Sequence, residues 1–340
     1  MITKKIRIGI LSPSNVAEKR FLPALVKSQN SEFAGLAHAS LNEWIGADEE
    51  LILRERAKVE TILDKFKGKM FDSYLSLITS NEIDAVYIPL PPSLHYKWAK
   101  LALENSKHVL LEKPATNNIE DTLQLIEISR KNDLALHENY MFGYHNQIAF
   151  VKNIIDSKQI GNVRLIRMSF EFPRRSVNDF RYKKDLGGGA LLDCGGYTIK
   201  YSSMLLGETA KVAQAILNFT DDFEVDMYGS GVMKNNEGQV VQLSFGMDNS
   251  YRCSLEVWGS LGSIYTNRIF TAPTNYNPII ELKRGNERKK IKLAMDDTFL
   301  KSIQAFENSI KDLNVRQKMF NEISQQAKYI DNFLRIAKTK

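Results

Sequence analysis

Apolar runs alternate with helical patterns along the first third of the chain. Five short apolar runs have the length of buried strands: 6–11, 33–39, 83–88, 109–111 and 134–136. The segments between them carry apolar residues at the three- and four-residue spacing of one helix face: 16–28, 55–67, 73–80, 95–106 and 119–131. Strands that alternate with helices at this spacing are typical of βαβ units, so the pattern predicts an α/β domain built on a parallel sheet.

Beyond Asn139 the pattern changes to a series of strands joined by short turns. A long strand is expected at 163–172, a helix at 187–206, and six further strands at 212–219, 224–233, 239–247, 252–258, 263–267 and 279–283. Two helical patterns follow, at 298–313 and 317–337. We therefore predict a Rossmann-type, doubly wound parallel sheet over 1–138, followed by an α+β domain over 139–340 with a large, mostly antiparallel open sheet.

Composition narrows the class of protein. The chain has 340 residues, of which 43% are hydrophobic and 25% charged, which excludes a disordered or collagen-like chain. Its 46 basic and 40 acidic side chains leave a net charge of +6, which suits an anionic small molecule but is too dispersed for a nucleic-acid partner. Cys194 and Cys253 provide neither a disulfide framework nor a metal cluster, so we expect a reducing compartment and no metal site.

The first residues do not have the pattern of a secretion signal. The apolar run 6–11 follows two lysines but is only six residues long, and Ser12 and Pro13 interrupt it. No stretch approaches the ~18 consecutive apolar residues of a membrane-spanning helix. We therefore expect a cytoplasmic protein with no membrane partner.

The turn after the first strand is a candidate phosphate site. In a doubly wound sheet this turn and the helix that follows it hold a dinucleotide pyrophosphate, and glycines let the backbone approach it. Here Ser12 and Ser14 stand at the first two glycine positions, Asn15 and Val16 follow, and Ala17 fills the third. An ordinary capped turn would carry the same residues, so this segment alone leaves binding open.

The end of the second predicted strand bears on the choice of dinucleotide. Enzymes that use NAD usually carry an acid here for the adenosine ribose, whereas this chain has no carboxylate before Glu43. His38 and Ser40 could instead hydrogen-bond a 2′-phosphate. The stretch therefore favours NADP, with NAD as the alternative because no arginine is present here.

A charged pair, Glu112 and Lys113, ends the fourth predicted strand and is followed by Pro114. The carboxyl edge of such a sheet is where ligands bind, and a lysine there can orient a substrate oxygen. The proline fixes the backbone and is a candidate for a cis bond. A salt-bridged surface turn is the alternative interpretation.

Three glycines, 187–189, precede a segment with Asp193 and Tyr197. The glycines would allow a ligand to approach closely, and the two polar residues are spaced i, i+4 as on one face of a helix. Tyrosine stays protonated at neutral pH and can act as a general acid toward a carbonyl. Taken alone, Tyr197 is better explained as a core residue with a satisfied hydroxyl.

These elements together resemble the glucose–fructose oxidoreductase/inositol dehydrogenase/rhizopine-catabolism (Gfo/Idh/MocA) family over nearly the whole chain. Further matching segments are 83–91 with His95, and 107–114. Tyrosine at position 197, where many members have histidine, indicates a branch that includes sugar 3-ketoreductases. Segments 20–25, 138–147 and 258–273 are similar to the nucleotide-sugar 3-ketoreductases of deoxysugar biosynthesis.

The resemblance implies an enzyme that transfers a hydride between NADP and a sugar carbonyl or hydroxyl, most directly to a C3 keto group on a nucleotide-linked deoxysugar. It implies Lys113, Tyr197 and Asp193 as catalytic residues. It implies these cofactor contacts: Ser12, Ser14, Asn15, Val16, His38, Ser40, Leu90, Pro91, His95, Glu112 and Lys113. It implies these substrate contacts: Tyr140, His145, Arg181 and Tyr197.

Two other functions stay open at this point. The chemistry could run in the oxidative direction, in an NADP-dependent sugar or trans-dihydrodiol dehydrogenase. The chain could also be a non-catalytic regulator that senses NADP, which the missing glycines at 12 and 14 favour and the intact Lys113 and Tyr197 oppose. By the same resemblance, we expect the second domain to bind substrate and to form a homodimer or homotetramer through its open sheet.

Overall fold

The computed structural model describes residues 4–44 and 46–338, and the chain forms two compact units. One contains the chain up to Asn139 together with Phe299–Ser324, and the other contains Tyr140–Thr298 and the chain from Gln325. The predicted division placed all of 139–340 in the second domain. The structure differs because 299–324 packs with the first unit, where Phe320 and Ile323 join its hydrophobic core.

Six parallel strands form the sheet of the first unit. They are β1 (Ile6–Leu11), β2 (Ser31–Ala37), β3 (Lys69–Phe71), β4 (Ala85–Ile88), β5 (His108–Leu111) and β6 (Leu136–Glu138). Their spatial order is β3-β2-β1-β4-β5-β6. This is the strand order of the dinucleotide-binding Rossmann fold, so the predicted doubly wound sheet is confirmed. The three-residue β3 was not predicted, because so short a strand shows no periodicity.

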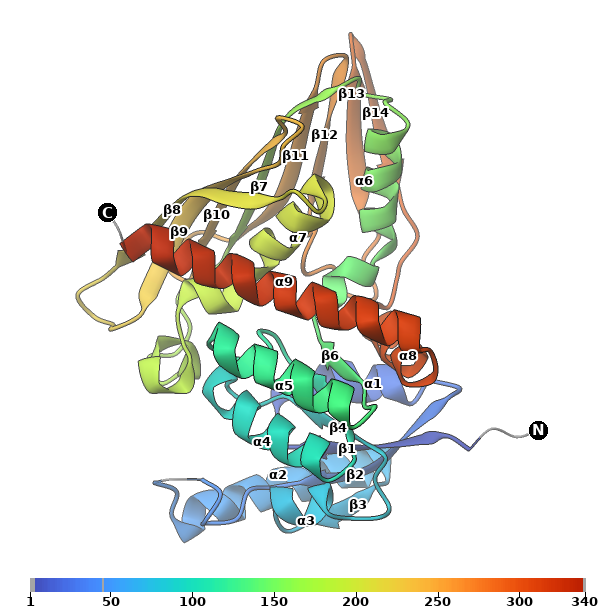
Figure 1. Ribbon diagram of the computed structural model, residues 1–340, viewed down its shortest axis with the longest axis vertical. Helices are drawn as coiled ribbons and strands as arrows, with labels where there is room; N and C mark the ends of the chain where they lie inside the picture. Colours follow the sequence, from blue (N-terminus) through green and yellow to red (C-terminus); the bar gives the residue numbers. More distant parts are fainter. Residues whose placement is uncertain (1–3, 45, 339–340) are drawn as a thin grey trace. The chain divides into compact units, whose positions relative to one another are not determined.

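Helices follow the strands of the first unit in the predicted alternation. They are η1 (Ala17–Phe21), α1 (Leu22–Leu25), α2 (Glu49–Phe66), α3 (Tyr74–Ile78), α4 (Pro92–Glu104) and α5 (Ile119–Lys131). Side chains of Asp48, Ser73 and Asn118 cap the N-termini of α2, α3 and α5. Figure 1 shows α4 and α5 side by side. Helix α8 (Thr298–Lys311) and the first half of α9 (Leu313–Lys338) complete this unit from Phe299 on.

The second unit is built on an eight-stranded sheet. Its strands are β7 (Val163–Glu171), β8 (Lys211–Phe219), β9 (Asp226–Lys234), β10 (Val240–Gly246), β11 (Arg252–Gly259), β12 (Gly262–Asn267), β13 (Ile279–Arg284) and β14 (Glu287–Lys292). They lie in the order β14-β13-β12-β11-β7-β10-β9-β8. Only the β7–β10 pairing is parallel, so the predicted, mostly antiparallel sheet is confirmed.

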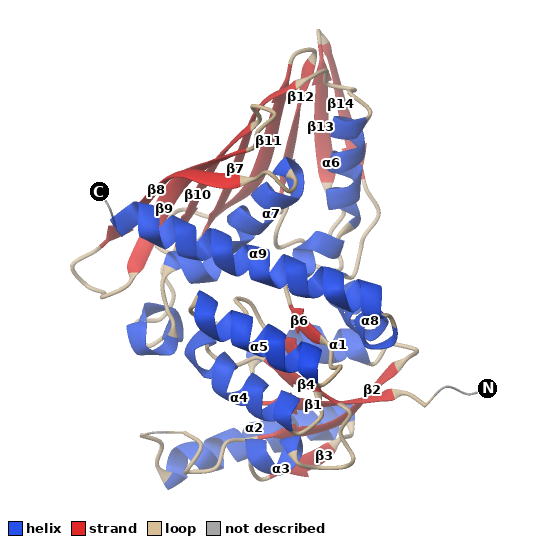
Figure 2. Ribbon diagram, in the orientation of Figure 1, coloured by secondary structure: helices blue, strands red, loops and turns tan. Residues whose placement is uncertain are grey.

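One strand and one α-helix of the second unit were not predicted. Strand β14, with the sequence Glu-Arg-Lys-Lys-Ile-Lys, is an almost fully charged edge strand, and charged edges discourage pairing with other chains. The other is helix α6 (Asn146–Asp156), in a stretch where the sequence pattern predicts no element. Figure 2 shows α6 and α7 (Gly196–Leu206) in front of the sheet, and the core between them contains Val151, Ile199 and Phe245.

No helix within 4–44 or 46–338 combines the length and apolarity that a membrane crossing needs. Over the same residues, no three His, Cys, Asp or Glu side chains gather as a metal site would require. Cys194 and Cys253 are both buried and unbonded to each other.

Candidate active site

The turn after β1 is held in a shape that usually requires glycine. Ser12 has a backbone φ of +82°, and its N–H donates to the carbonyl of Ala37 across 3.0 Å. The hydroxyl of Ser14 accepts the N–H of Ala17 at 3.2 Å, which caps the helix that starts here. The backbone thus adopts the left-handed turn of a phosphate loop although serine replaces glycine.

A buried tyrosine supports this turn from the neighbouring helix. Tyr74, at the start of α3, hydrogen-bonds Ser12 through its hydroxyl, and burial raises the pKa of that hydroxyl. Above the turn, the first N–H groups of the helix, those of Asn15 and Val16, have no acceptor within the helix itself, as in every helix N-terminus. Such N–H groups are suited to an anion such as a pyrophosphate.

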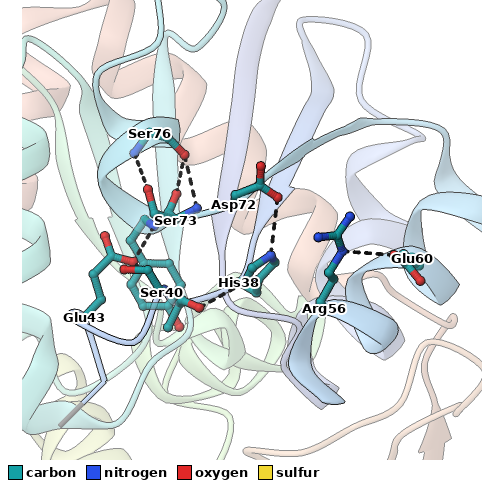
Figure 3. Close-up of polar contacts among 10 residues, drawn as sticks. His38, Ser40, Glu43, Arg56, Glu60, Asp72, Ser73 and Ser76 are labelled. Atoms are coloured by element: carbon teal, nitrogen blue, oxygen red, sulfur yellow. Dashed lines mark hydrogen bonds and ion pairs between the residues drawn. The ribbon is translucent and has the colours of Figure 1, made fainter. Parts of the chain in front are cut away.

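The first acid after β2 caps a helix. Glu43 accepts the backbone N–H groups of Ser40 and Tyr74 at 2.9 Å each and that of Leu75 at 2.8 Å (Figure 3). Its carboxylate therefore stabilises the N-terminus of α3. All three bonds of this carboxylate go to backbone N–H groups of the protein itself.

Another acid at this end of the sheet was missed. His38 is 5% exposed, and its Nδ1 lies 2.9 Å from the carbonyl of Ala39. Its Nε2 lies 3.6 Å from the carboxylate of Asp72, which directly follows β3 (Figure 3). The side chain of Asp72 is 81% exposed. Asp72 could not be identified from the sequence because β3 itself was not predicted.

Glu112 is the centre of several hydrogen bonds at the end of β5. Its Oε1 accepts the hydroxyl of Tyr87 and the side-chain amide of Asn139, each at 2.7 Å. The backbone N–H of Lys113 also bonds to this carboxylate. Burial raises the pKa of Glu112, and these bonds and the charge of Lys113 offset part of the rise. The Lys113–Pro114 peptide bond is cis, as the sequence suggested.

A fully buried histidine joins the segments that follow β4 and β5. The Nε2 of His95 lies 2.7 Å from the carbonyl of Leu90, and its Nδ1 lies 2.8 Å from the carbonyl of Pro114. Burial lowers the pKa of His95, although both carbonyls favour the protonated ring. Pro91 immediately precedes α4. His95 therefore holds the segment next to Lys113 in place.

Tyr197 stands in the first turn of α7, and its ring is enclosed by other aromatic rings. Their centroids lie 5.1–6.0 Å away and belong to Tyr140, Phe142, Phe170 and Phe270. The residue is 7% exposed, and its hydroxyl lies 3.9 Å from the sulfur of Met141. The packing fixes the ring, so the hydroxyl has a defined direction.

The segment before Tyr197 is π-helical, whereas an α-helix was expected. Over η5 (Leu191–Gly195) the helix is wider, and the N–H of Gly196 reaches back to the carbonyl of Leu191, five residues earlier. Asp193 and Tyr197 were expected at i, i+4 on one face of an α-helix. The structure instead places Asp193 within the π-helical turn and Tyr197 in the α-helix that follows it. Single π turns of this kind occur often at functional sites.

The glycines before this helix make room for the protein itself. Gly189 has φ +116°, and a Cβ there would lie 2.4 Å from Oδ1 of Asp226. Asp226 accepts the N–H of Leu191 at 2.7 Å and so fixes the start of η5. A Cβ on Gly188 would lie 2.4 Å from the carbonyl of Arg181. The structure thus gives these two glycines a packing reason that the sequence interpretation did not foresee.

Arg181 is paired with carboxylates. Its Nε donates to Asp193 at 2.7 Å, and its Nη1 donates to Asp179 at 3.1 Å. Burial lowers the pKa of Arg181, but the two carboxylates more than offset this, and the net pKa is raised. Asp193 and Arg181, predicted as separate catalytic and substrate residues, thus form one ion pair.

The other two predicted substrate residues have structural partners within the second unit. The Nδ1 of His145 accepts the N–H of Gln147 at 3.1 Å and caps α6. The hydroxyl of Tyr140 accepts the side-chain amide of Gln326 at 3.3 Å and packs over Gly196. Both residues are at least 97% buried. Each supports the framework around Tyr197.

The predicted site residues therefore fall into two groups. The first unit gathers the 12–16 turn, His38 and Ser40, and the Leu90, His95 and Lys113 segments at the carboxyl edge of its parallel sheet. The second unit gathers Tyr197, Tyr140, Arg181 and Asp193 around η5 and α7. A dinucleotide-type turn and a lysine at the sheet edge in one unit, and a rigidly held tyrosine in the other, are features expected of an NAD(P)-dependent oxidoreductase.

The comparison with family models identifies the family. Residues 14–140 match the "Oxidoreductase family, NAD-binding Rossmann fold" model, and residues 148–265 match the "GFO/IDH/MocA C-terminal domain" model. The chain belongs to the Gfo/Idh/MocA family of oxidoreductases, as its motifs indicated.

Individual relatives agree over almost the whole chain. A dTDP-3,4-didehydro-2,6-dideoxy-alpha-D-glucose 3-reductase from Actinomadura kijaniata is 33% identical over 96% of this chain and 94% of its own. One of the same name from Streptomyces violaceoruber is 34% identical over 91% and 86%. The crystal structure of a 3-ketoreductase from Actinomadura kijaniata with NADP and TDP-benzene has a TM-score of 0.89, with 32% identity and 98% of each chain covered.

Proposed function

We propose that this protein is an NADPH-dependent 3-ketoreductase that acts on a dTDP-linked 3,4-diketo-2,6-dideoxyhexose or a closely related nucleotide-linked deoxysugar. The observation that carries the proposal is similarity to 3-reductases of that substrate across both units, at 33% identity over 96% of the chain. The presence of Lys113 and Tyr197 in the expected structural settings supports a catalytic protein over a regulator that only senses NADP.

The first unit suits a dinucleotide. The left-handed backbone at Ser12 and the helix N-terminus at Asn15 and Val16 would hold the pyrophosphate, with Ser14 fixing the turn. His38 and Ser40 would face the adenosine 2′-phosphate. Leu90, Pro91, His95, Glu112 and Lys113 would border the nicotinamide. When bound, NADPH supplies a hydride for the sugar ketone.

Lys113 and Tyr197 would both act on the sugar oxygen that receives the proton. Tyr197 would donate the proton to the developing alkoxide, because its enclosed ring gives the hydroxyl a fixed direction. Lys113 would orient the oxygen and stabilise its charge. Asp193 would act through its ion pair with Arg181, and that pair would contribute to the substrate side of the site.

The proposal also covers the role of each unit, the oligomeric state of the protein and its location in the cell. The first unit would bind the cofactor, and the second unit would bind the substrate, with Tyr140 and His145 as supporting residues. The exposed apolar side chains Ile216, Phe219, Tyr228 and Trp258 of the eight-stranded sheet support a homodimer or homotetramer. The two cysteines, buried and unpaired with each other, fit a cytoplasmic enzyme.

The direct test is the loss of NADPH absorbance in the presence of freshly generated dTDP-3,4-diketo-2,6-dideoxyglucose. We expect turnover with NADPH, slower turnover with NADH, and none when the sugar lacks the nucleotide. Parallel reactions with NADP⁺ and free aldoses or dihydrodiols test the oxidative alternative. Turnover only in those parallel reactions, or NADPH binding without any turnover, would overturn the proposal.

A further inference from the structure

Behind Glu112, a line of buried side chains continues away from the proposed cofactor site. Asn139 donates its amide to Glu112, and the hydroxyl of Ser302 on α8 donates to Oδ1 of Asn139 at 2.7 Å. The Nε2 of His137 lies 3.0 Å from the same hydroxyl. We call the four side chains the buried relay: His137, Ser302, Asn139 and Glu112. The first three are no more than 2% exposed.

With Glu112 ionised, one arrangement of protons satisfies all three bonds of the buried relay. A carboxylate can only accept, so Asn139 presents its NH₂ to Glu112 and its oxygen to Ser302. Ser302 has one proton, and giving it to Asn139 leaves the hydroxyl oxygen to accept N–H from His137. The opposite tautomer would donate from Nδ1 toward the sulfur of Met319, 3.3 Å away, and thioether sulfur is a weak acceptor. Every donor in the relay therefore points toward Glu112.

The relay joins two of the three places where the chain passes between its two units. Asn139 is the last residue before the chain leaves the first unit, and Ser302 is the fourth residue after it returns at Phe299. At its other end, Glu112 accepts the backbone N–H of Lys113. Side chains at these two passages are thus hydrogen-bonded, through one carboxylate, to the backbone of the proposed catalytic lysine.

We propose that the buried relay holds the backbone of Lys113 in its productive position, and that Ser302 and Asn139 are positioning residues for the reaction. This inference rests on the proposed function, because it concerns the rate of that reaction. It means that α8 affects the rate of the reaction, although none of the residues identified from the motifs lies on this helix.

A matched pair of variants isolates the hydroxyl of Ser302. Thr and Val have the same shape, so Ser302→Thr and Ser302→Val add the same bulk and differ only in the hydroxyl. We expect Ser302→Val to have a turnover rate about tenfold below that of Ser302→Thr, the worth of one buried hydrogen bond. The dissociation constant for NADPH is expected to be equal in the two. Equal turnover rates in the two folded variants would overturn the proposal.

A second pair covers the case in which the added methyl groups disturb folding. Ser302→Ala and Ser309→Ala each remove a buried hydroxyl from α8, but that of Ser309 donates only to the carbonyl of Phe306 in its own helix. We expect the turnover rate to fall in Ser302→Ala and to stay near the original in Ser309→Ala. Equal effects of the two changes would indicate a general loss of helix stability and contradict a positioning role.

A third measurement does not depend on turnover, so it separates this inference from the proposed function. The chain has five histidines, which makes the nitrogen NMR spectrum of ¹⁵N-histidine-labelled protein tractable. The relay requires a proton on Nε2 of His137, and the resonance that moves in Ser302→Val identifies this ring. A ring protonated on Nδ1 alone would overturn the relay, whether or not the protein reduces the proposed sugar.

Discussion

Arg181 donates its Nε–H to Asp193 over 2.7 Å, and this bond joins the loop before the three glycines to the π-helical turn that leads to Tyr197. Both side chains are less than a quarter exposed. An arginine that the sequence indicates as a ligand for the substrate is thus also the counter-ion of a residue next to the catalytic helix. Breaking a partly buried ion pair costs free energy. We therefore expect the loss of this pair to disturb the position of Tyr197.

Arg181→Lys tests this link. Lysine keeps the charge but cannot fork to Asp193 and Asp179 as the guanidinium does. We expect kcat/KM for the sugar to fall about tenfold or more while NADPH binding persists. Arg174→Lys is the control, because Arg174 also forks to two carboxylates, those of Asp222 and Asp248, but at the surface. If both variants behave alike, the buried pair has no special role.

Gly189→Ala tests the close approach of Asp226. The substitution meets both a left-handed φ of +116° and an oxygen 2.4 Å from the new Cβ, so we expect a loss of roughly 2–4 kcal/mol and a clearly lower melting temperature. Gly238→Ala provides the comparison, since Gly238 has φ +78° and nothing within 4 Å of a Cβ. It should lose only about 1 kcal/mol. Similar melting temperatures for the two variants would show that Asp226 does not fix this turn.

Asp226→Asn should change how stability depends on pH. Burial raises the pKa of Asp226 to about 6, above its unfolded value near 4. The folded state therefore binds the proton more tightly, so its stability is greatest below pH 4 and falls as the pH rises through 6, by at most about 3 kcal/mol. The variant lacks this loss. Its melting temperature relative to the original should rise between pH 4 and 6 and then level off; a constant difference across that range would contradict the account.

The hydrophobic periodicity of the sequence predicts some of the helices and strands and misses others. Strand β1 and helix α5 each have a clear apolar pattern of their own, and both were predicted at their observed bounds. Strand β14 has almost no apolar residue, and β3 is too short to show a period, so Asp72 at its end was also missed. These elements exist because neighbouring strands pair with them.

In the candidate site, too, residues within short motifs could be predicted, and residues with partners far away in the chain could not. Lys113 and Tyr197 belong to compact motifs, so their settings could be predicted from sequence. Ser302 and Asp226 act on residues far away in the chain, and an isolated serine or aspartate carries no sign of such a partner. The π-helical turn at Leu191–Gly195 also escaped prediction, because a single inserted residue leaves the apolar pattern almost unchanged.

Lys113→Ala and Tyr197→Phe test the assigned chemistry. Each should lower the turnover rate by orders of magnitude, since one removes the charge at the sugar oxygen and the other the proton donor. NADPH binding, followed by fluorescence, should persist in both. Tyr140→Phe is a useful comparison, because it removes a hydroxyl that bonds to Gln326 within the same aromatic cluster. Near-normal turnover in Lys113→Ala or Tyr197→Phe would refute the assigned roles.

The most direct test of the central claim follows the hydride itself. The protein is incubated with NADPH that carries deuterium at the transferable C4 position and with the dTDP-linked 3,4-diketo-2,6-dideoxyhexose, and the product sugar is examined by NMR and mass spectrometry. The account predicts one deuterium per sugar, located at C3. Deuterium at C4 of the sugar, or a sugar that stays unlabelled while the protein binds NADPH, would contradict it.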